Sequence, residues 1–582
     1  MSNQLGTGVV LLTVRRSGAL PEALRGMLTD ACDAPPVRVN GVWVGTWGLG
    51  RDAPTREDPI LLTSTNQSDS GTAPADEIAR WLADGDLWCL GSMLPPFGAV
   101  GLTDDGLRLT TDQLAFRNIF RCVGDGWSAV STSALLLAKL LGRGLDPTGL
   151  RLQSQLGWQL GTLTLFDGIT ALDPRESVVL TEAGVRSEWI PEPDDRGLLP
   201  LDDGVAMVAQ GLREMLAAYL DEGHEPTLQL TGGQDSRIVL SAIPVARRRG
   251  LRTMTLGIPG SPDAEIARVI SERYGMSHTV HSIEDLGTPS PQEWFQRVLE
   301  TARAHECMAD PIARSVTGWA EESFEQGHRL SGLGGELARG FFYLGPVRPI
   351  LVTRRRSERL ARWRMLANDA VAVEALALDL RDAHEVSVGE IHSAISEAGP
   401  EWFSATDELY LHRIRRWGGL GEGAVAFRRT LVNPMLDHRF IDPVRRISPA
   451  GKKGSRFLGQ LQMALDEELA SLPLDDRPAP KIYGTPGPVN LLRTNSTRVR
   501  KLARKVRQRL LGARRPPAGA SVVSAALTRH IHDEPAVLDP ARESGVFDEA
   551  WLEDVARGHN GVPAANLALL MNVIAAGREG AL

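Results

Sequence analysis

The ten residues from Leu228 to Arg237, L-Q-L-T-G-G-Q-D-S-R, combine the residue types that an anion-binding turn requires. Adjacent glycines let the backbone approach a ligand closely, and successive N–H groups at a helix start form a pocket for phosphate oxygens. The hydroxyls of Thr231 and Ser236 can add donors, whereas Asp235 would repel phosphate unless it holds a bridging Mg²⁺ ion. The segment predicts a strand, a turn and a helix that bind phosphate with magnesium; the alternative is a junction in which the glycines serve only the turn.

Three further segments follow the first loop along the chain. They are Thr255 to Ile258 with Asp263 and Glu265 after it, L-S-G-L-G-G-E-L over residues 330–337, and N-P-M-L-D over residues 433–437 with Phe440 after it. The first loop lacks the Gly-Lys-Ser/Thr ending of a Walker A loop. It resembles instead the S/T-G-G-x-D-S loop of ATP pyrophosphatases, which split ATP between its α and β phosphates. Taken together, the four segments resemble those of the asparagine synthetase family.

The resemblance implies a role for each matching residue. The residues expected to bind ATP around its pyrophosphate are Leu230, Thr231, Gly232, Gly233, Asp235 and Ser236. The residues expected to border AMP are Leu256, Ser331 and Gly332. Asp235 and Glu336 are the implied Mg²⁺ ligands, so that ATP and Mg²⁺ are the implied cofactors. Glu336 stands where the family usually has Asp; its side chain is one methylene longer but offers the same hard oxygen ligands.

A positioned cation is needed as well, because the transition state of adenylation gathers negative charge. The family uses a lysine late in the synthetase domain. Lys481 follows a proline-rich stretch and precedes two glycines, in a loop that could close over the site. We therefore predict Lys481, with Asp235 and Glu336, as the catalytic residues. Lys452 and Lys453, in a Gly-Lys-Lys-Gly turn, are the other candidates and could equally be solvated surface residues.

The elements that must position these residues change in character near residue 195. Short apolar runs between turn residues predict strands over residues 1–195, with a helix over 132–141. The polar segment 191–197 contains two prolines and is the predicted domain boundary. Alternating strands and helices over residues 228–274 predict a doubly wound parallel sheet. Beyond about residue 350 the chain is predicted to be mostly helical.

The resemblance assigns residues 1–195 to a glutamine amidotransferase-like domain of the Ntn type, with an αββα arrangement. It assigns residues 200–582 to an α/β ATP pyrophosphatase domain with a helical C-terminal part. The N-terminal matches are D-Q-L-A-F-R over 112–117, S-T-S-A-L over 131–135, and segments within 160–174. Glutaminase chemistry there needs an N-terminal cysteine whose α-amine acts as base. Here position 2 is Ser2 and the first cysteine is Cys32, which favours a scaffold without ammonia production; an N-terminal serine nucleophile is the alternative.

The third position of the Ser331 segment bears on the nucleophile. Asparagine synthetases carry Glu there and β-lactam synthetase carries Tyr, whereas this chain has Leu333, which cannot transfer a proton or form a hydrogen bond. An α-amine, with a pKa of about 8, is already partly neutral near pH 7, and proximity can supply much of its reactivity. T-G-G-x-D-S-R, then G-G-E-x-x-R-G over residues 334–340, and a first domain without its cysteine resemble the lasso peptide cyclases.

This resemblance implies adenylation of an Asp or Glu side chain in a leader-cleaved precursor peptide. The peptide's N-terminal amine would then close a macrolactam, releasing AMP and pyrophosphate. The implied partners are the core peptide, a leader peptidase and a leader-recognition protein. The alternatives are an asparagine synthetase-type ligase using ammonia, another amide ligase using a small-molecule amine, and a non-catalytic nucleotide-binding module.

Bulk properties exclude several classes of protein. A chain of 582 residues is too long for one compact core, and its net charge of −8 argues against general nucleic-acid binding. The four cysteines lie far apart without a CxxC pair, which predicts neither a zinc site nor a disulfide framework. No signal-peptide pattern opens the chain. The uncharged stretch 561–577 is too short and polar to span a bilayer, so a buried helix, no transmembrane segment and a cytoplasmic location are expected.

Residues 493–515 contain ten basic residues and no acidic one, with apolar residues at helical spacing. The pattern predicts a basic amphipathic helix. Such a helix could dock on its own domain with solvated arginines. It could instead meet an acidic protein surface, a peptide or anionic lipid.

Overall fold

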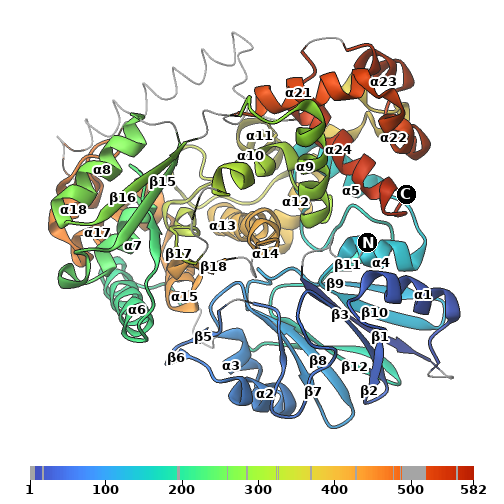
Figure 1. The fold of residues 1–582 in the computed structure, drawn as a ribbon. Coiled ribbons are helices and arrows are strands. Elements are labelled where there is room, and N and C mark those ends of the chain that lie inside the picture. Colours follow the sequence, from blue (N-terminus) through green and yellow to red (C-terminus); the bar gives the residue numbers. More distant parts are fainter. Residues whose placement is uncertain are drawn as a thin grey trace.

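The computed structural model shows an α/β protein in which antiparallel and parallel sheets lie in different parts of the chain (Figure 1). The residues that it describes are 7–15, 19–63, 65–192, 197–257, 260–282, 286–322, 324, 327–366, 370–425, 429–475, 477–485, 487, 490, 519–558 and 561–582. Ser2, most of the predicted domain boundary and the predicted basic helix lie outside these residues. The α/β class and the parallel sheet are confirmed.

Two antiparallel sheets make up the N-terminal part. The first has the order β11-β9-β10-β1-β3-β2 and the second the order β13-β12-β8-β7-β4. Their strands are β1 (Gly8–Val14), β2 (Val37–Val39), β3 (Val42–Trp47), β4 (Ile60–Leu61), β7 (Gly98–Leu102), β8 (Gly106–Thr111), β9 (Phe120–Gly124), β10 (Trp127–Ser131), β11 (Ile169–Ala171), β12 (Glu176–Thr181) and β13 (Gly184–Trp189). A small hairpin, β5 (Gln67–Ser68) and β6 (Gly71–Thr72), pairs by itself.

Strand β1 shows how these sheets stack. Its side chains alternate between faces: Val9 and Leu11 belong to a core made by the strands of both sheets, whereas Val10 and Leu12 pack in a core with helices. Helices α1 (Glu22–Ala31) and α4 (Ala134–Leu141) supply that outer core. Helix α2 (Ala75–Asp84) and the short α3 (Leu87–Gly91) cover the other sheet. The result is four layers in the order helix, sheet, sheet, helix.

A five-stranded, fully parallel sheet follows after helix α6 (Leu201–Asp221). Its order is β16-β15-β14-β17-β18. The strands are β14 (Thr227–Gln229), β15 (Arg252–Gly257), β16 (Ser277–Ser282), β17 (His328–Leu330) and β18 (Thr430–Val432), with α7 (Asp235–Ala242) and α8 (Pro262–Tyr274) as the first connections. The chain builds β14, β15 and β16 in one direction and then returns to add β17 and β18 on the other side of β14.

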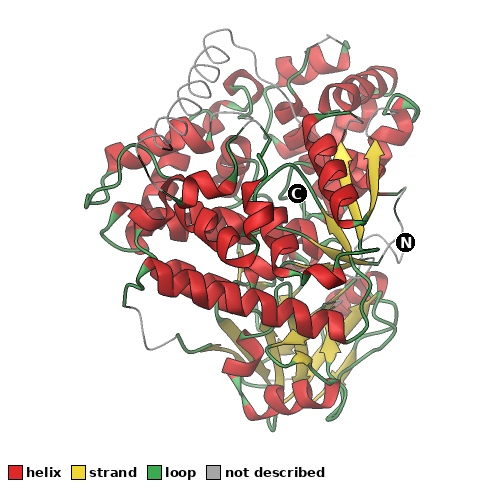
Figure 2. Ribbon diagram, turned by 90° about the vertical axis from the view of Figure 1, so that its left-hand side faces the viewer, coloured by secondary structure: helices red, strands yellow, loops and turns green. Residues whose placement is uncertain are grey.

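The remainder is mostly helical, as predicted, and helices dominate the view in Figure 2. These helices are α5 (Pro147–Leu156), α9 (Pro291–Ala304), α10 (Pro311–Glu321), α11 (Arg354–Leu360), α12 (Ala383–Glu397), α13 (Trp402–Arg413), α14 (Gly419–Gly423), α15 (His438–Arg446), α16 (Pro449–Lys452), α17 (Arg456–Leu465), α18 (Glu467–Ser471), α19 (Pro480–Gly484), α21 (Ala520–Asp533), α22 (Asp539–Ser544), α23 (Glu549–Ala556) and α24 (Ala564–Arg578). Five of these α-helices begin with a proline after an N-cap side chain that accepts from the backbone: Asp146, Ser261, Ser290, Asp310 or Ser448.

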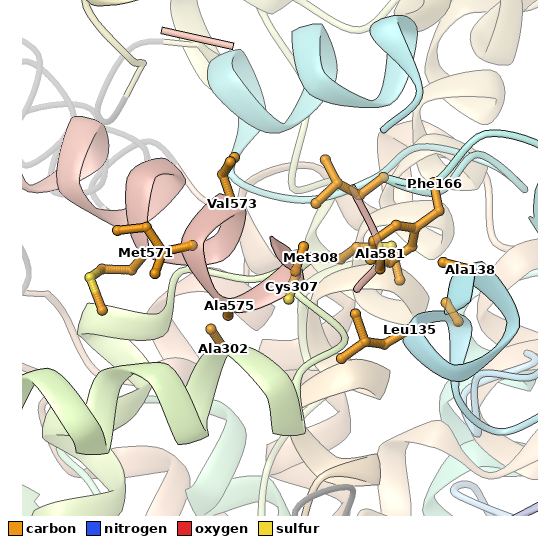
Figure 3. Close-up of a cluster of buried hydrophobic side chains, with 14 of the residues drawn as sticks. Leu135, Ala138, Phe166, Ala302, Cys307, Met308, Met571, Val573, Ala575 and Ala581 are labelled. Atoms are coloured by element: carbon orange, nitrogen blue, oxygen red, sulfur yellow. The ribbon is translucent and has the colours of Figure 1, made fainter. Parts of the chain in front are cut away.

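One hydrophobic core joins the first and last parts of the chain (Figure 3). In that view Leu135 and Phe166 lie beside Met308 and the final turns of α24, including Ala575. Helix α24 is buried over most of its length, its Asn566 and Asn572 included, which confirms the predicted buried helix. Among the described residues, no helix has both the length and the apolar character that crossing a bilayer requires.

Candidate functional site

The two glycine-rich loops meet at the point where the strand order of the parallel sheet reverses. Strands β14 and β17 are neighbours, and β15 lies on the far side of β14. The loop that follows β14 and the loop that follows β17 therefore leave the same edge of the sheet side by side. In doubly wound sheets this is where ligands bind, outside the carboxyl ends of the strands.

The first loop is held by hydrogen bonds between its own side chains and backbone. Ser236 Oγ accepts from the backbone N–H of Thr231 at 3.1 Å, and Thr231 Oγ1 accepts from the N–H of Gly233 at 3.1 Å. Asp263, at the start of α8, accepts from the N–H of Gly232 at 2.9 Å. Three of the backbone N–H groups expected to face phosphate thus donate to acceptors within the protein. A bound anion would replace these acceptors.

The glycines of the second loop allow it to lie directly against the first. A Cβ atom at Gly332 would be 2.6 Å from the backbone of Asp235 and Ser236, and one at Gly335 would be 2.7 Å from the Asp235 carboxylate. Real Cβ atoms essentially never come this close to another heavy atom, so backbone excludes a larger residue at Gly332, and a larger residue at Gly335 would force the Asp235 carboxylate to move. The structure therefore brings together Thr231–Ser236 and Ser331–Glu336, as the resemblance implies.

Two carboxylates from different loops share one arginine. Arg339 Nη2 lies 3.3 Å from Asp235 Oδ2 and 3.1 Å from Glu336 Oε1. The other oxygen of Glu336 accepts from the Tyr410 hydroxyl of α13 at 2.8 Å. Burial raises the pKa of Asp235 to about 6; Glu336 adds to this rise, whereas Arg339 and Arg477 oppose it.

The donor set fits a divalent cation. Asp235 Oδ1 is buried and has no hydrogen-bond partner among the described residues. Its other oxygen and the carboxylate of Glu336 converge on the same guanidinium nitrogen. Carboxylate oxygens are the ligands that Mg²⁺ prefers. Asp235 and Glu336 are therefore the residues that could hold the metal.

A part-buried chain of hydrogen bonds holds the side chain of Ser331 in place. Ser331 Oγ donates to Asn433 Oδ1 at 2.5 Å, and Asn433 Nδ2 donates to Glu422 Oε2 at 2.5 Å. The predicted N-P-M-L-D segment thus contributes its asparagine to the site. Because the Ser331 hydroxyl donates to Asn433, its lone pairs face the backbone N–H of Leu333, 3.3 Å away.

Replacement of Glu422 by Gln should change how stability depends on pH. Burial raises the pKa of Glu422 to about 7, against the opposing hydrogen bond from Asn433, whereas the unperturbed value is 4.5. The folded state thus holds the proton more tightly, so its stability falls as pH rises from about 4.5 through 7. We expect Glu422→Gln to gain on the order of 2 kcal/mol relative to wild type between pH 5 and pH 8. Thermal unfolding of the variant and of wild type at pH 5 and pH 8 checks this. The prediction would be contradicted if the two proteins differed in stability by the same amount at both pH values.

The predicted lysines have different surroundings. Lys452 is 2% exposed and donates to Asp407 Oδ2 at 2.7 Å. Its interpretation as a solvated surface residue is wrong, because its ammonium group is buried beside Asp407 of α13. Lys453 donates to the carbonyl of Gly345. Lys481 is exposed on α19, and its catalytic role stays a prediction.

The segment that leads to Lys481 does pass along the first loop. The N–H of Asp475 donates to the carbonyl of Gly232 at 3.1 Å. The buried Arg237 donates to the carbonyls of Leu472 and Pro473. These contacts hold residues 472–475 against the turn and the start of α7.

Other predicted residues lie nearby in the expected elements. Leu256 is half-buried near the end of β15. The side chain of the preceding Thr255 donates to the carbonyl of Leu230 at 2.6 Å, which ties β15 to the start of the first loop. Ile258 lies outside the described residues.

Sequence reasoning placed Arg339 in the G-G-E-x-x-R-G motif but gave it no role, and it missed Tyr410 and the role of Asp263. The role of Arg339 could have been found, because Arg339 follows Glu336 by three residues, a spacing that places both side chains on one face of a tight helical turn. Tyr410 and Asp263 carry no local signal, since they reach the loops from α13 and α8.

A separate cavity of about 660 Å³ lies between the two parts of the chain, and none of the predicted site residues lines it. Trp88 and Arg175 contribute from the N-terminal part, Met207 from α6 and His438 from α15. Helix α13 contributes Ser404 and Glu408 to this cavity, whereas its Tyr410 reaches the loops.

A cavity of about 40 Å³ lies at the start of β1, lined by Thr7, Trp47, Thr132 and Glu306 among others. A Cβ atom at Gly8 would lie 2.1 Å from Thr132 Oγ1.

Neither a scan of the chain against models of known protein families nor a search of curated proteins returned a match.

Proposed function

We propose that this chain is an ATP-dependent amide ligase that activates a carboxylate as an acyl-adenylate between the two glycine-rich loops. One observation carries the proposal: Asp235 and Glu336, from neighbouring loops at the reversal point of the parallel sheet, face a common position. An acid directly after a Gly-Gly turn suits a metal–phosphate ligand and would be unfavourable for a phosphate alone.

In this proposal the turn at Gly232 and Gly233 and the start of α7 bind the pyrophosphate portion of ATP. The hydroxyls of Thr231 and Ser236 lie 3.2 Å apart and contact each other. In the complex with ATP they would instead donate hydrogen bonds to phosphate oxygens. Asp235 and Glu336 would hold Mg²⁺, which when bound offsets the charge of the phosphates. The residues proposed to border AMP are Leu256, Ser331 and Gly332.

The chemistry proceeds in two displacements. A carboxylate oxygen of the substrate attacks the α-phosphorus, the bond from that phosphorus to the bridging oxygen breaks, and pyrophosphate leaves. An amine nitrogen then attacks the acyl carbon, the bond from that carbon to the AMP oxygen breaks, and the amine loses a proton to solvent. Lys481 is proposed to stabilise the charge that gathers in the first step. Leu333 offers no base for the second step, which favours an amine that arrives neutral.

We further propose that both reacting groups belong to one peptide, as in a lasso peptide cyclase that forms a macrolactam. The four-layer N-terminal part supports comparison with a glutaminase-like domain. Leu333 can neither donate nor accept a proton, which favours an amine delivered with the substrate over ammonia released from glutamine. A leader peptidase and a leader-recognition protein would then supply the peptide.

The test uses synthetic peptides with a free N-terminus and a single Asp or Glu at successive positions. With ATP and Mg²⁺, the expected product has lost one water, with one AMP and one pyrophosphate formed per ring. An N-terminally acetylated peptide is the matched control, since it can be adenylated but cannot close.

Three other outcomes would replace the proposal. AMP formation with aspartate and ammonia would indicate an asparagine synthetase-type enzyme. Turnover that depends on a small-molecule amine would indicate another amide ligase. Nucleotide binding without any turnover across the peptide set would indicate a non-catalytic module.

A further inference from the structure

The guanidinium of Arg339 stands where the two carboxylates of the candidate metal site converge. A single nitrogen, Nη2, contacts Asp235 at 3.3 Å and Glu336 at 3.1 Å. All three side chains are largely enclosed: 22% of Arg339, 18% of Asp235 and 25% of Glu336 is exposed. Without this cation, two acids from separate loops would face each other in a poorly solvated space, which is unfavourable.

The local backbone fixes Arg339 in this place. Glu336 and Arg339 lie in a 3₁₀ turn, Gly335–Arg339, where residues three apart lie on one face. The turn is enclosed by Gly334 and Gly340, with φ angles of 104° and 63°, in the left-handed region that favours glycine. Sequence spacing and glycine placement therefore direct the arginine toward Glu336.

The carboxylates are less free to move than the arginine. Glu336 is held on its far side by the buried Tyr410 hydroxyl. Asp235 packs against Gly335, where even one added carbon would collide with it. Arg339 has four side-chain torsions, and the only ion pairs found for it among the described residues are those with these two acids.

We propose that Arg339 is the counter-ion of Asp235 and Glu336 when no nucleotide is bound. On nucleotide binding, Mg²⁺ would take its place between the two carboxylates, and the guanidinium of Arg339 would move to a phosphate. This inference rests on the proposed function. Two cations cannot share one gap at this separation without strong repulsion. A displaced guanidinium needs a new anionic partner, and its planar fork matches phosphate oxygens.

The proposal makes metal and nucleotide binding depend on each other. A metal ion alone must displace Arg339 and leave it without an anion, so it should bind weakly. A metal ion that arrives with a triphosphate supplies that anion, so the two should bind with positive coupling, which is reciprocal by thermodynamic necessity. Arg339 is thus a positioning and binding residue that acts before any chemistry.

The test is a Mn²⁺ titration at pH 8, followed by electron paramagnetic resonance. Without nucleotide, Arg339→Gln should bind Mn²⁺ about tenfold more tightly than wild type, because the competing cation is gone. With a non-hydrolysable ATP analogue, the same variant should bind the metal–nucleotide about tenfold more weakly. The coupling between the two ligands should largely vanish.

Two further variants sharpen the test. Arg413→Gln is the matched control, because it also removes a positive charge near Glu336. The guanidinium of Arg413 lies over the rings of Phe341 and Trp417 and not between the two acids. Neither the coupling nor the metal affinity should therefore change more than about twofold. Arg339→Lys keeps a competing charge but loses the fork, so metal affinity should stay near wild type while nucleotide affinity falls.

Equal or weaker Mn²⁺ binding by folded Arg339→Gln without nucleotide would overturn the inference. Failure of the proposed function looks different: wild type would bind no ATP analogue, or would bind it without turnover of any peptide, while the metal titration without nucleotide would still report on Arg339.

Discussion

Asp235→Asn should lower ATP-dependent pyrophosphate release by about 10³-fold or more, while the protein unfolds at the same temperature or a higher one. The activity falls because the amide removes an anionic metal ligand at the phosphates. Stability is maintained because the wild-type carboxylate is buried, with burial raising its pKa to about 6. Near pH 8 its ionised form costs folding free energy that a neutral, equally shaped side chain does not. Pyrophosphate release and thermal unfolding, measured on the same preparation, check both parts.

Asp263→Asn is the matched control for this prediction. Asp263 also lies at the loop, but it accepts from the N–H of Gly232, and an asparagine oxygen can accept in the same way. The rate at which Asp263→Asn releases pyrophosphate should fall about tenfold or less. Equal losses in the two variants, or undiminished product formation by Asp235→Asn, would show that Asp235 is not the metal ligand.

Lys452→Met should destabilise the protein by about 3–5 kcal/mol, the usual cost of leaving a buried charge without its partner. Lys452 is 2% exposed, and its ammonium group lies 2.7 Å from Asp407, which also accepts from the Tyr343 hydroxyl at 2.8 Å. Without the lysine, that carboxylate would remain buried and charged or would have to take up a proton. Denaturant unfolding gives the loss directly.

A double variant and a second lysine separate this structural role from catalysis. Lys452→Met combined with Asp407→Asn should recover most of the stability, because the amide oxygen still accepts from Tyr343 and no charge is left. Lys481→Met should unfold like wild type, since its side chain is exposed, but release pyrophosphate much more slowly. Full stability of Lys452→Met, or wild-type turnover by Lys481→Met, would contradict these two assignments.

The loop from Thr231 to Ser236 was predictable because its signal is local. Glycines, hydroxyls and an acid in consecutive positions determine a turn and a helix start from their own backbone preferences. The predicted alternation of strands and helices around it is also confirmed: α7 begins at Asp235 and β15 covers Arg252–Gly257. Strand and helix periodicity is a property of neighbouring residues, so it survives without knowledge of the fold.

The environment of each charged side chain was much harder to predict. A Gly-Lys-Lys-Gly turn has the composition of a surface loop, yet Lys452 is enclosed because α13 brings Asp407 to it from 45 residues earlier. Tyr410 likewise reaches Glu336 across 74 residues. Nothing in the local sequence encodes such pairs, since they depend on how helices pack around the sheet.

By itself, the sequence determined the α/β class, the parallel sheet and the chemical character of the two glycine-rich loops. Only the tertiary structure decided that these loops meet, because the strand order places β14 beside β17 although about a hundred residues separate them. It also decided that Arg339 lies between Asp235 and Glu336, and which lysine is buried. Backbone preferences act over a few residues, whereas distances between charges are set by the packing of the whole domain.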